Sequence, residues 1–206
     1  KDFILTNGAE MQAPQIPGTL PAADIKRLKL DAFDRSNDLK PLSVVTGDII
    51  AKNAYEWSKA TESPLAQAAV KGAEKITVRP LLGHSGKAVK LPKGASLSYD
   101  FYCDKSGDAR FTIAVIPCFL NAVKNMRVSV SIDRGEPVIC QLKEVYNSKD
   151  WKFDLWRGQT LKSFYVTLPG GSHNVTIKAL DDNVMIDQWV LDYDVDREYY
   201  VFPVAK

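Results

Sequence analysis

The feature that most constrains the fold is an alternation of apolar and polar residues, which recurs along the chain after Gly47. Residues 96–103 read SLSYDFYC and place an apolar side chain at every odd-numbered position. The segments 110–115, 126–133 and 172–180 repeat this pattern. A period of two buries one face of a strand and leaves the other face in water, as in antiparallel sheets. The chain is therefore predicted to be mainly β.

Turn-forming residues separate these runs at 92–94 (PKG), 104–107 (DKSG), 134–135 (RG) and 169–171 (PGG). About ten short strands at such spacing favour two antiparallel sheets packed as a β-sandwich. Two helical insertions are also expected. The first covers residues 65–71, because Ser63 can cap a helix and Pro64 suits its first turn. The second lies within residues 147–160.

Residues 1–46 differ from the rest of the chain. Residues 11–21 hold three prolines, which favour an irregular or extended chain. Residues 22–34 then place Ile25, Leu28, Ala32 and Phe33 on one side of a helix. We therefore divide the chain into an N-terminal extension or linker with one short helix, residues 1–46, and a β-sandwich domain, residues 47–206.

Charge and hydropathy limit the partners and the compartment. The chain has 27 basic and 25 acidic residues, so its net charge of +2 gives no electrostatic reason to expect nucleic acid or an anionic membrane. No apolar run approaches the length of a transmembrane helix. The chain begins at Lys1 and is expected to be secreted, periplasmic or exposed at the cell surface, with its signal peptide removed.

The cysteine count argues against a disulfide framework or a zinc site. Cys103, Cys118 and Cys140 are odd in number and lack CxxC spacing, so at least one is free or pairs between chains. Because all three lie in apolar segments, buried thiols are favoured over a disulfide. Neither His84 nor His173 lies at ligand spacing from a cysteine.

No catalytic motif is present in the sequence. Neither histidine lies near a nucleophile elbow, and there is no P-loop or GxGxxG motif. Residues 83–86 (GHSG) are predicted to form a tight loop between two strands. Acidic residues near the C-terminus could offer oxygen ligands to calcium, but a turn followed by solvated strand faces is the favoured interpretation. These residues are Asp181, Asp182, Asp187, Asp192, Asp194 and Asp196.

The aromatic residues carry the clearest functional hint. Four tryptophans and eight tyrosines are enough to form a sugar platform, because a flat ring stacks on the apolar face of a pyranose. Trp57, Trp151 and Trp156 fall in or near predicted loops, whereas Trp189 lies inside the last strand and is predicted to pack in the core. For Trp151 and Trp156, packing and ligand contact remain equal alternatives.

Several segments together resemble a known domain. These are 76–91 (ITVRPLLGHSGKAVKL), 97–102 (LSYDFY), 128–136 (VSVSIDRGE), 150–168 (DWKFDLWRGQTLKSFYVTL) and 170–193 (GGSHNVTIKALDDNVMIDQWVLDY). In this order they are similar to the C-terminal domain of glycoside hydrolase family 115, whose members are α-glucuronidases acting on decorated xylan. The resemblance covers roughly residues 48–196.

The resemblance implies a jelly-roll β-sandwich, similar to galactose-binding-like and carbohydrate-binding modules. It also implies that glycosidase chemistry resides in other domains, so no catalytic residue is carried over and this chain alone is not expected to be catalytic. Related sandwiches often begin with an Ala-Glu pair whose glutamate helps hold a structural calcium. Here Tyr55 replaces that glutamate, and Glu56 would point to the opposite face of a regular strand. This departure counts against calcium, whose remaining candidate ligands are Glu56 and Asp192.

The leading hypothesis is a non-catalytic accessory domain that binds carbohydrate, such as plant xylan fragments, through loops at one end of the sandwich. Trp151 and Trp156 are the first candidate contacts, and Trp57, His84 and Arg157 are the second. The alternative is a purely structural domain that packs on a catalytic partner or forms a homodimer, with its aromatic residues buried. A third and weaker hypothesis is a small hydrolase.

Overall fold

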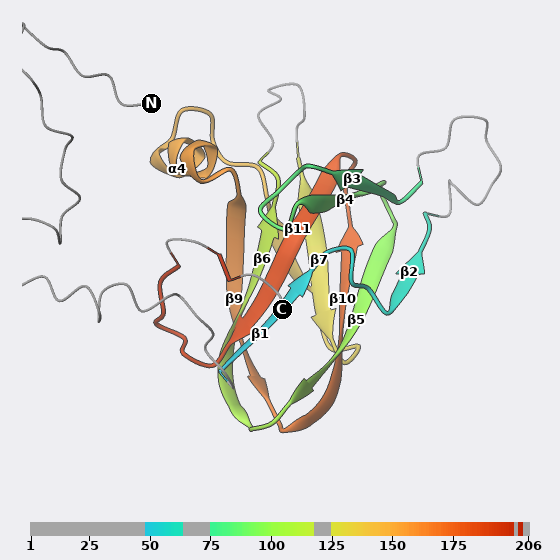
Figure 1. Ribbon diagram of the computed structural model, residues 1–206, viewed down its shortest axis with the longest axis vertical. Coiled ribbons are helices and arrows are strands. Elements are labelled where there is room, and N and C mark those ends of the chain that lie inside the picture. Colours follow the sequence, from blue (N-terminus) through green and yellow to red (C-terminus); the bar gives the residue numbers. More distant parts are fainter. Residues whose placement is uncertain (1–47, 64–74, 118–124, 200–201, 204–206) are drawn as a thin grey trace, which may run out of the picture. The chain divides into compact units, whose positions relative to one another are not determined.

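The computed structural model describes residues 48–63, 75–117, 125–199 and 202–203. In this part of the chain, two antiparallel sheets pack face to face (Figure 1), so the predicted β-sandwich is confirmed. The predicted N-terminal extension 1–46 with its helix, the predicted helix 65–71 and Cys118 lie outside the described residues. The division of the chain at residues 46 and 47 therefore stays a prediction.

The first sheet, called sheet A here, has six strands. Five follow one another in the order β3 (Thr77–Pro80), β4 (Lys87–Leu91), β11 (Val184–Asp192), β6 (Gly107–Val115) and β9 (Thr160–Leu168). The sixth strand, β1 (Ile49–Asn53), also pairs with β11. Every pairing in this sheet is antiparallel.

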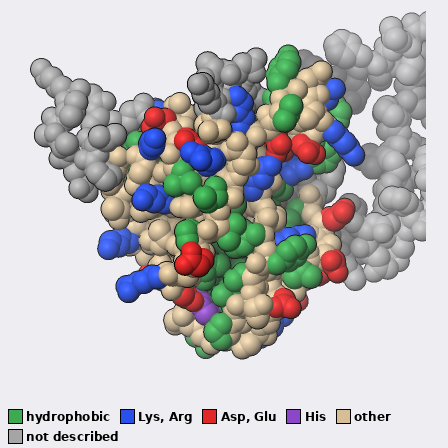
Figure 2. Space-filling view, turned by 180° about the vertical axis from the view of Figure 1, so that it is seen from behind, with side chains coloured by type: hydrophobic (Ala, Val, Ile, Leu, Met, Phe, Trp, Pro, Cys, Tyr) green, Lys and Arg blue, Asp and Glu red, His purple; other side chains and the backbone are tan. Residues whose placement is uncertain are grey.

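The second sheet, called sheet B, has five strands. Their order is β2 (Lys59–Thr61), β5 (Ser96–Cys103), β10 (Gly171–Ala179), β7 (Arg127–Ile132) and β8 (Val138–Gln141). The helix α4 (Lys149–Arg157) lies between β8 and β9 in the sequence. On the face shown in Figure 2, acidic and basic side chains are interspersed among hydrophobic ones. No described helix is long and apolar enough to cross a membrane.

The core lies between the two sheets and follows the alternation in the sequence. In β5, Leu97 and Tyr99 are fully buried, whereas Tyr102 is exposed. Trp189 of β11 is also fully buried, and its ring lies 5.6 Å from that of Tyr99 and 5.3 Å from that of Phe111, between ring centres. The predicted core position of Trp189 is therefore confirmed, and the sandwich is organised around this aromatic cluster.

A smaller apolar cluster lies on the other face of sheet A. Ala114 of β6 and Val190 of β11 are fully buried there, although this face is the outer one. Phe202 and Tyr199, from the segment after β11, pack against them. The C-terminal segment therefore covers part of a face that strand alternation alone assigns to water.

Helix α4 has clear local start and stop signals. The side chain of Ser148 accepts a hydrogen bond from the backbone N–H of Trp151 at 3.1 Å, as an N-cap residue does. Gly158 has a φ of 71° and donates from its N–H to the carbonyl oxygen of Asp154, as a C-terminal glycine does. The helix predicted within residues 147–160 is therefore confirmed.

The two described cysteines are buried thiols, as predicted. Cys103 is fully buried and Cys140 is 7% exposed, and neither forms a disulfide. Burial raises the pKa of both thiols, which keeps them protonated and poorly nucleophilic.

Candidate functional site

A cavity of about 810 Å³ brings together three of the five predicted contact residues, namely His84, Trp156 and Arg157. It lies over the outer face of sheet A, where helix α4 and the loop 83–86 form two of its walls. Residues 197–199 form a third wall. The other lining residues are Arg110, Thr112, Phe153, Leu161, Ser163, Arg197, Glu198 and Tyr199. The sequence predicted contacts from loops at one end of the sandwich, whereas the lining of this cavity also includes a face of sheet A.

The floor of the cavity is made by two neighbouring strands. Thr112 of β6 is directly paired with Ser163 of β9, and their hydroxyl oxygens lie 2.8 Å apart. Because side chains alternate along each strand, both point outward while Phe111 and Ile113 point into the core. Leu161 follows at the next outward position on β9. The floor therefore combines hydroxyl groups with an apolar side chain.

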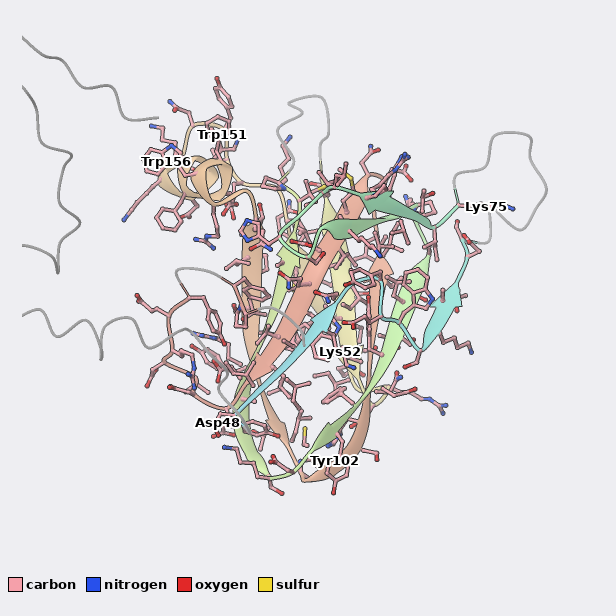
Figure 3. The ribbon with its side chains drawn as sticks, viewed as in Figure 1. Asp48, Lys52, Lys75, Tyr102, Trp151 and Trp156 are labelled. Atoms are coloured by element: carbon pink, nitrogen blue, oxygen red, sulfur yellow. The ribbon has the colours of Figure 1, made fainter. Side chains whose placement is uncertain are left out.

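The helix wall exposes aromatic rings. Trp156 is 81% exposed and Phe153 is 49% exposed, and their spacing of three residues places them on one side of α4 (Figure 3 labels Trp156). The guanidinium of Arg157 lies 4.7 Å from the centre of the Phe153 ring. This side of the helix therefore presents two rings and a cation to the cavity.

The same helix buries a carboxylate instead of these rings. Asp154 is 7% exposed, and the hydroxyl of Thr160 donates to it at 2.7 Å. Burial raises the pKa of Asp154, although the hydrogen bond from Thr160 opposes this change. A short helix that buries an aspartate and exposes a tryptophan departs from the usual amphipathic arrangement, and such departures occur at binding surfaces.

The loop 83–86 is held by a carboxylate that sequence reasoning missed. Asp187 of β11 is fully buried and accepts from the backbone N–H of His84 at 2.7 Å and of Ser85 at 3.1 Å. The Ser85 hydroxyl at 2.5 Å and the Gln159 amide at 2.6 Å also donate to it. A side chain at Gly83 would place its Cβ 2.3 Å from Asp187 Oδ1, so glycine is required there.

The histidine ring links this loop to helix α4. His84 Nε2 lies 2.8 Å from the carbonyl oxygen of Arg157. Because a carbonyl can only accept, Nε2 carries the proton in this contact. The positions of His84 and Arg157 are therefore fixed together, and both depend on Asp187 through the loop.

Two more arginines line the cavity, Arg197 in the third wall and Arg110 in β6 of sheet A. Arg197 Nε lies 2.9 Å from Asp192 Oδ2, and the guanidinium of Arg110 lies 5.4 Å from the centre of the Tyr199 ring. Tyr199 donates to Asp192 as well, and burial together with this hydrogen bond raises the pKa of the Tyr199 hydroxyl. Asp192 therefore anchors the C-terminal segment.

The charges that line the cavity are mostly positive. Arg110, Arg157, Arg197 and Glu198 line it, and Arg197 is also paired with Asp192 and Asp194. The cavity is therefore suited to ligands that carry hydroxyl groups or an anionic group.

For two of the acidic residues near the C-terminus, the interpretation from the sequence was wrong. Solvated strand faces were expected after the turn at residues 181–182, but Asp187 and Asp192 are both fully buried. Asp187 accepts hydrogen bonds from residues 28 and more than 100 positions away in the sequence, whereas Asp192 accepts from Tyr199, in the segment that follows β11. Strand alternation could not reveal these partners.

Trp151 and Trp57 do not line the cavity. Trp151 is half-buried, and its ring packs edge-on against Tyr146 at 5.0 Å between ring centres. Trp57 is half-buried and packs against the main core. The structure therefore separates these two rings from His84, Trp156 and Arg157.

The two candidate calcium ligands are also separated. Residues 54–55 form a turn, and Glu56 accepts from the backbone N–H of Asn53 at 2.8 Å. Asp192 pairs with Ile49 at the other end of β1, roughly 13 Å along the strand from Asn53. Among the described residues, no group of three or more His, Cys, Asp or Glu side chains could hold a metal ion.

No curated protein matches the chain. Among solved structures, a family GH115 4-O-methyl-α-glucuronidase with specificity for decorated arabinogalactans is similar, with 26% identity and a TM-score of 0.60. The match covers 73% of this chain and 18% of that enzyme's chain, so this chain spans only a small part of its relative.

Two more distant structures are also similar to this chain. The GH26-CBM35 β-(1,4)-mannanase of Podospora anserina is 12% identical, with a TM-score of 0.50, over 74% of this chain and 29% of that one. The C-terminal CBM6 of LamC, a marine laminarinase from Zobellia galactanivorans, is 16% identical, with a TM-score of 0.48, over 70% of this chain and 99% of that one.

The family comparison covers most of the chain. Residues 46–205 match the profile of the glycosyl hydrolase family 115 C-terminal domain. This range contains both sheets, helix α4 and all the residues that line the cavity. The chain therefore belongs to the family of glycosyl hydrolase family 115 C-terminal domains.

Proposed function

We propose that this domain is a non-catalytic accessory domain that binds carbohydrate in the cavity between helix α4, the loop 83–86 and sheet A. The observation that carries the proposal is the ring of Trp156, which is 81% exposed beside His84 and Arg157. An exposed tryptophan above a polar floor suits a pyranose, whose apolar face stacks on a ring while its hydroxyl groups bind polar side chains.

Each wall of the cavity has a distinct part in this proposal. The exposed hydroxyl of Ser163 offers a polar group at the floor, and the buried hydroxyl of Thr112 lies 2.8 Å from it and orients it. With Nε2 of His84 bonded to Arg157, the Nδ1 atom of a neutral ring is an acceptor for a sugar hydroxyl. The arginine side chains suit the carboxylate of a uronic acid, because a guanidinium can bind it through two parallel hydrogen bonds.

Family membership supports the wider context. A C-terminal domain of a glycosyl hydrolase family implies a longer polysaccharide-degrading protein, which we propose to be α-glucuronidase-like and to act on decorated xylan. The catalytic residues would then lie outside this chain. The same context supports a secreted, periplasmic or cell-surface location.

The second candidate function is a structural or interaction domain. Val145, Tyr146 and Leu155, in or just before helix α4, are 76%, 64% and 45% exposed and lie outside the cavity lining. Exposed apolar groups of this kind suit a protein contact, either with a catalytic domain of the same protein or with a second copy. In that case Trp156 would contact protein and no sugar would bind.

Calorimetric titration with neutral xylo-oligosaccharides and with glucuronoxylan fragments tests the proposal. Trp156→Ala should weaken binding of the glucuronoxylan fragments by about 1–3 kcal/mol, which is roughly tenfold to more than a hundredfold in affinity. The melting temperature should stay close to that of the unchanged protein, because the ring is largely in water.

Tyr165→Ala is the matched control. Tyr165 is 70% exposed on β9 but does not line the cavity, so its removal should leave the affinity unchanged. Equal affinities for the unchanged protein and Trp156→Ala, or no binding of either fragment, would favour the structural alternative.

A further inference from the structure

A second hollow of about 630 Å³ lies at the end of the sandwich away from helix α4. Figure 3 shows Tyr102 at this end, whereas Trp151 and Trp156 lie at the other end. The hollow is formed by β5, β10 and the turn after β7. Its lining includes the polar and aromatic residues Asp100, Tyr102, Asp133, Ser172, His173 and Asn174.

An exposed ring stands beside polar side chains in this hollow. Tyr102 is 67% exposed, although it lies in a strand whose neighbouring apolar residues are buried. In the pairing of β5 with β10, Ser172 lies opposite Tyr102, and Asn174 lies opposite Asp100. All four side chains share the outward face, because side chains alternate along both strands.

The polar side chains are already oriented by the protein. The Asn174 amide donates to Asp100 Oδ1 at 2.7 Å, and the Asn174 backbone N–H donates to Asp133 Oδ1 at 2.9 Å. Asp133 lies in a tight turn, where it and Arg134 have φ angles of 51° and 61°. The N–H of Gly135 closes this turn on the carbonyl of Ile132 at 2.8 Å.

The buried His173 contacts the side chain of Asp133. His173 is 7% exposed, and its Nδ1 lies 2.6 Å from Asp133 Oδ2. Its Nε2 lies 2.9 Å from the carbonyl oxygen of Pro169, and its ring packs against Phe101 at 5.5 Å between ring centres. Both carboxylates of the hollow thus already accept hydrogen bonds from neighbouring residues of the protein.

We propose that this hollow is a second glycan-binding site, which takes an uncharged sugar. The ring of Tyr102 would stack on the pyranose, and Asp100 and Asp133 would accept hydrogen bonds from its hydroxyls. Ser172 and Asn174 offer further polar groups at the same surface. An exposed aromatic ring beside pre-oriented carboxylates and an amide is the arrangement that sugar hydroxyls require.

The charge of the hollow decides between classes of sugar. A uronic acid would bring a third carboxylate to a site that already holds two, and like charges repel. The positive charge of an amino sugar would be attracted less strongly than by two carboxylates without partners, because Asp133 is paired with His173 and Asp100 accepts from Asn174. The arginine-lined cavity at helix α4 has the opposite character. The two sites are therefore expected to prefer different residues of a decorated polysaccharide.

The test is a titration of the full chain followed by NMR, with three probes: xylohexaose, an aldouronic acid from glucuronoxylan, and a glucosamine oligomer. Xylohexaose should shift the backbone amide signals of Tyr102, Ser172 and Asn174. The aldouronic acid should shift the backbone amide signals of His84 and Trp156, which xylohexaose should leave in place. If the helix α4 cavity binds no sugar, only the shifts of His84 and Trp156 should be absent. The two proposals are therefore tested separately.

Variants then identify the ring. Tyr102→Ala should lower the affinity for xylohexaose at this site at least tenfold and leave binding of the aldouronic acid unchanged. Tyr102→Phe should retain most of the affinity, because the ring remains. Tyr165→Ala, another exposed ring, should change nothing.

The proposal is overturned if xylohexaose leaves Tyr102, Ser172 and Asn174 unshifted, or if Tyr102→Ala binds it as tightly as the unchanged protein. Tighter binding of the glucosamine oligomer than of xylohexaose would show a cation site and would also overturn it. Because Tyr102 is mostly exposed, its variants should keep the melting temperature of the unchanged protein.

Discussion

His173 Nδ1 lies 2.6 Å from Asp133 Oδ2, and this contact joins the turn after β7 to the start of β10. The other ring nitrogen faces the carbonyl oxygen of Pro169, which can only accept. A histidine between two acceptors satisfies both only when both nitrogens carry protons. The charged imidazolium is thus the form that this buried position suits.

The first prediction concerns the pH dependence of stability. Burial disfavours the charged ring, but the contacts with Asp133 and Pro169 outweigh it and raise the pKa of His173 above its ordinary 6.5. Burial alone would raise the pKa of Asp133, but His173 and Asn174 lower it below its ordinary 3.8. The pair therefore stabilises the fold fully between about pH 4 and pH 6.5.

Stability should decrease on both sides of this pH range. The contribution of His173 should be lost as pH rises through its folded pKa, and that of Asp133 as pH falls through its own. His173→Gln should lower the free energy of unfolding by about 1–3 kcal/mol near pH 6. In this variant, the decrease in stability that the unchanged protein shows as pH rises above 6.5 should be absent. Denaturant unfolding at pH values below, within and above this range measures both decreases in the free energy of unfolding. An unchanged slope above pH 6.5 in His173→Gln would contradict this assignment.

The second prediction concerns Asp187. Asp187→Ala removes the acceptor of four hydrogen bonds, and a buried donor left unsatisfied costs about 1–3 kcal/mol, so the free energy of unfolding should fall by at least this amount. Hydrogen exchange at the amides of His84 and Ser85 should also accelerate. Asp182→Ala is the matched control, because exposed Asp182 accepts only from the N–H of Lys93 among the contacts described here. Comparable losses in the two variants would refute a special role of Asp187.

The third prediction compares two glycines of one loop. Gly83 and Gly86 have φ angles of 79° and 76°, so alanine at either position should cost about 1–2 kcal/mol in backbone strain. Only at Gly83 would the new Cβ also meet Asp187, since the space beside Gly86 is open. Gly83→Ala should therefore destabilise the protein more than Gly86→Ala in thermal unfolding, and should also weaken ligand binding at His84. Equal melting temperatures would contradict this.

The fourth prediction concerns the buried carboxylate of helix α4. Because burial raises the pKa of Asp154, its contribution to stability falls as pH rises from about 3.8 through the folded pKa. Asp154→Asn retains an acceptor for Thr160 and carries no charge, so it should match or exceed the unchanged protein at neutral pH. That advantage should shrink as the solution is acidified, as measured by chemical unfolding at several pH values.

Asp150→Asn is the control for this change. Asp150 is exposed in the first turn of the same helix, where a negative charge is favourable. Its replacement should cost about 0.3–1 kcal/mol at neutral pH. If Asp154→Asn destabilises the protein at neutral pH more than Asp150→Asn does, the carboxylate charge of Asp154 is needed and our interpretation is wrong.

The sequence was informative wherever a short segment decides its own structure. Alternation identified the buried faces of β5 and β10, and it placed Trp189 in the core. Ser148 and Gly158 delimit α4 through contacts within a few residues of each other. Order and spacing of several weak motifs identified the family that the profile match then showed.

The candidate site depended on contacts between distant segments. His84 lies after β3 and Trp156 lies in α4, and they meet because β11, which pairs with both β4 and β6, supplies Asp187. Nothing in the local pattern separates Trp156 from Trp151, or the buried Asp192 from the exposed Asp194.

The sequence by itself therefore determined the core-facing positions of strands such as β5 and β10, the region that contains helix α4, and the family. Only the tertiary structure decided which loops meet around the cavity, which aspartates are buried, and that Tyr102 stands beside Asp133 at the far end. The physical reason is that alternation and capping depend on neighbours a few residues away. Strand order and register are instead set by the packing of the whole core.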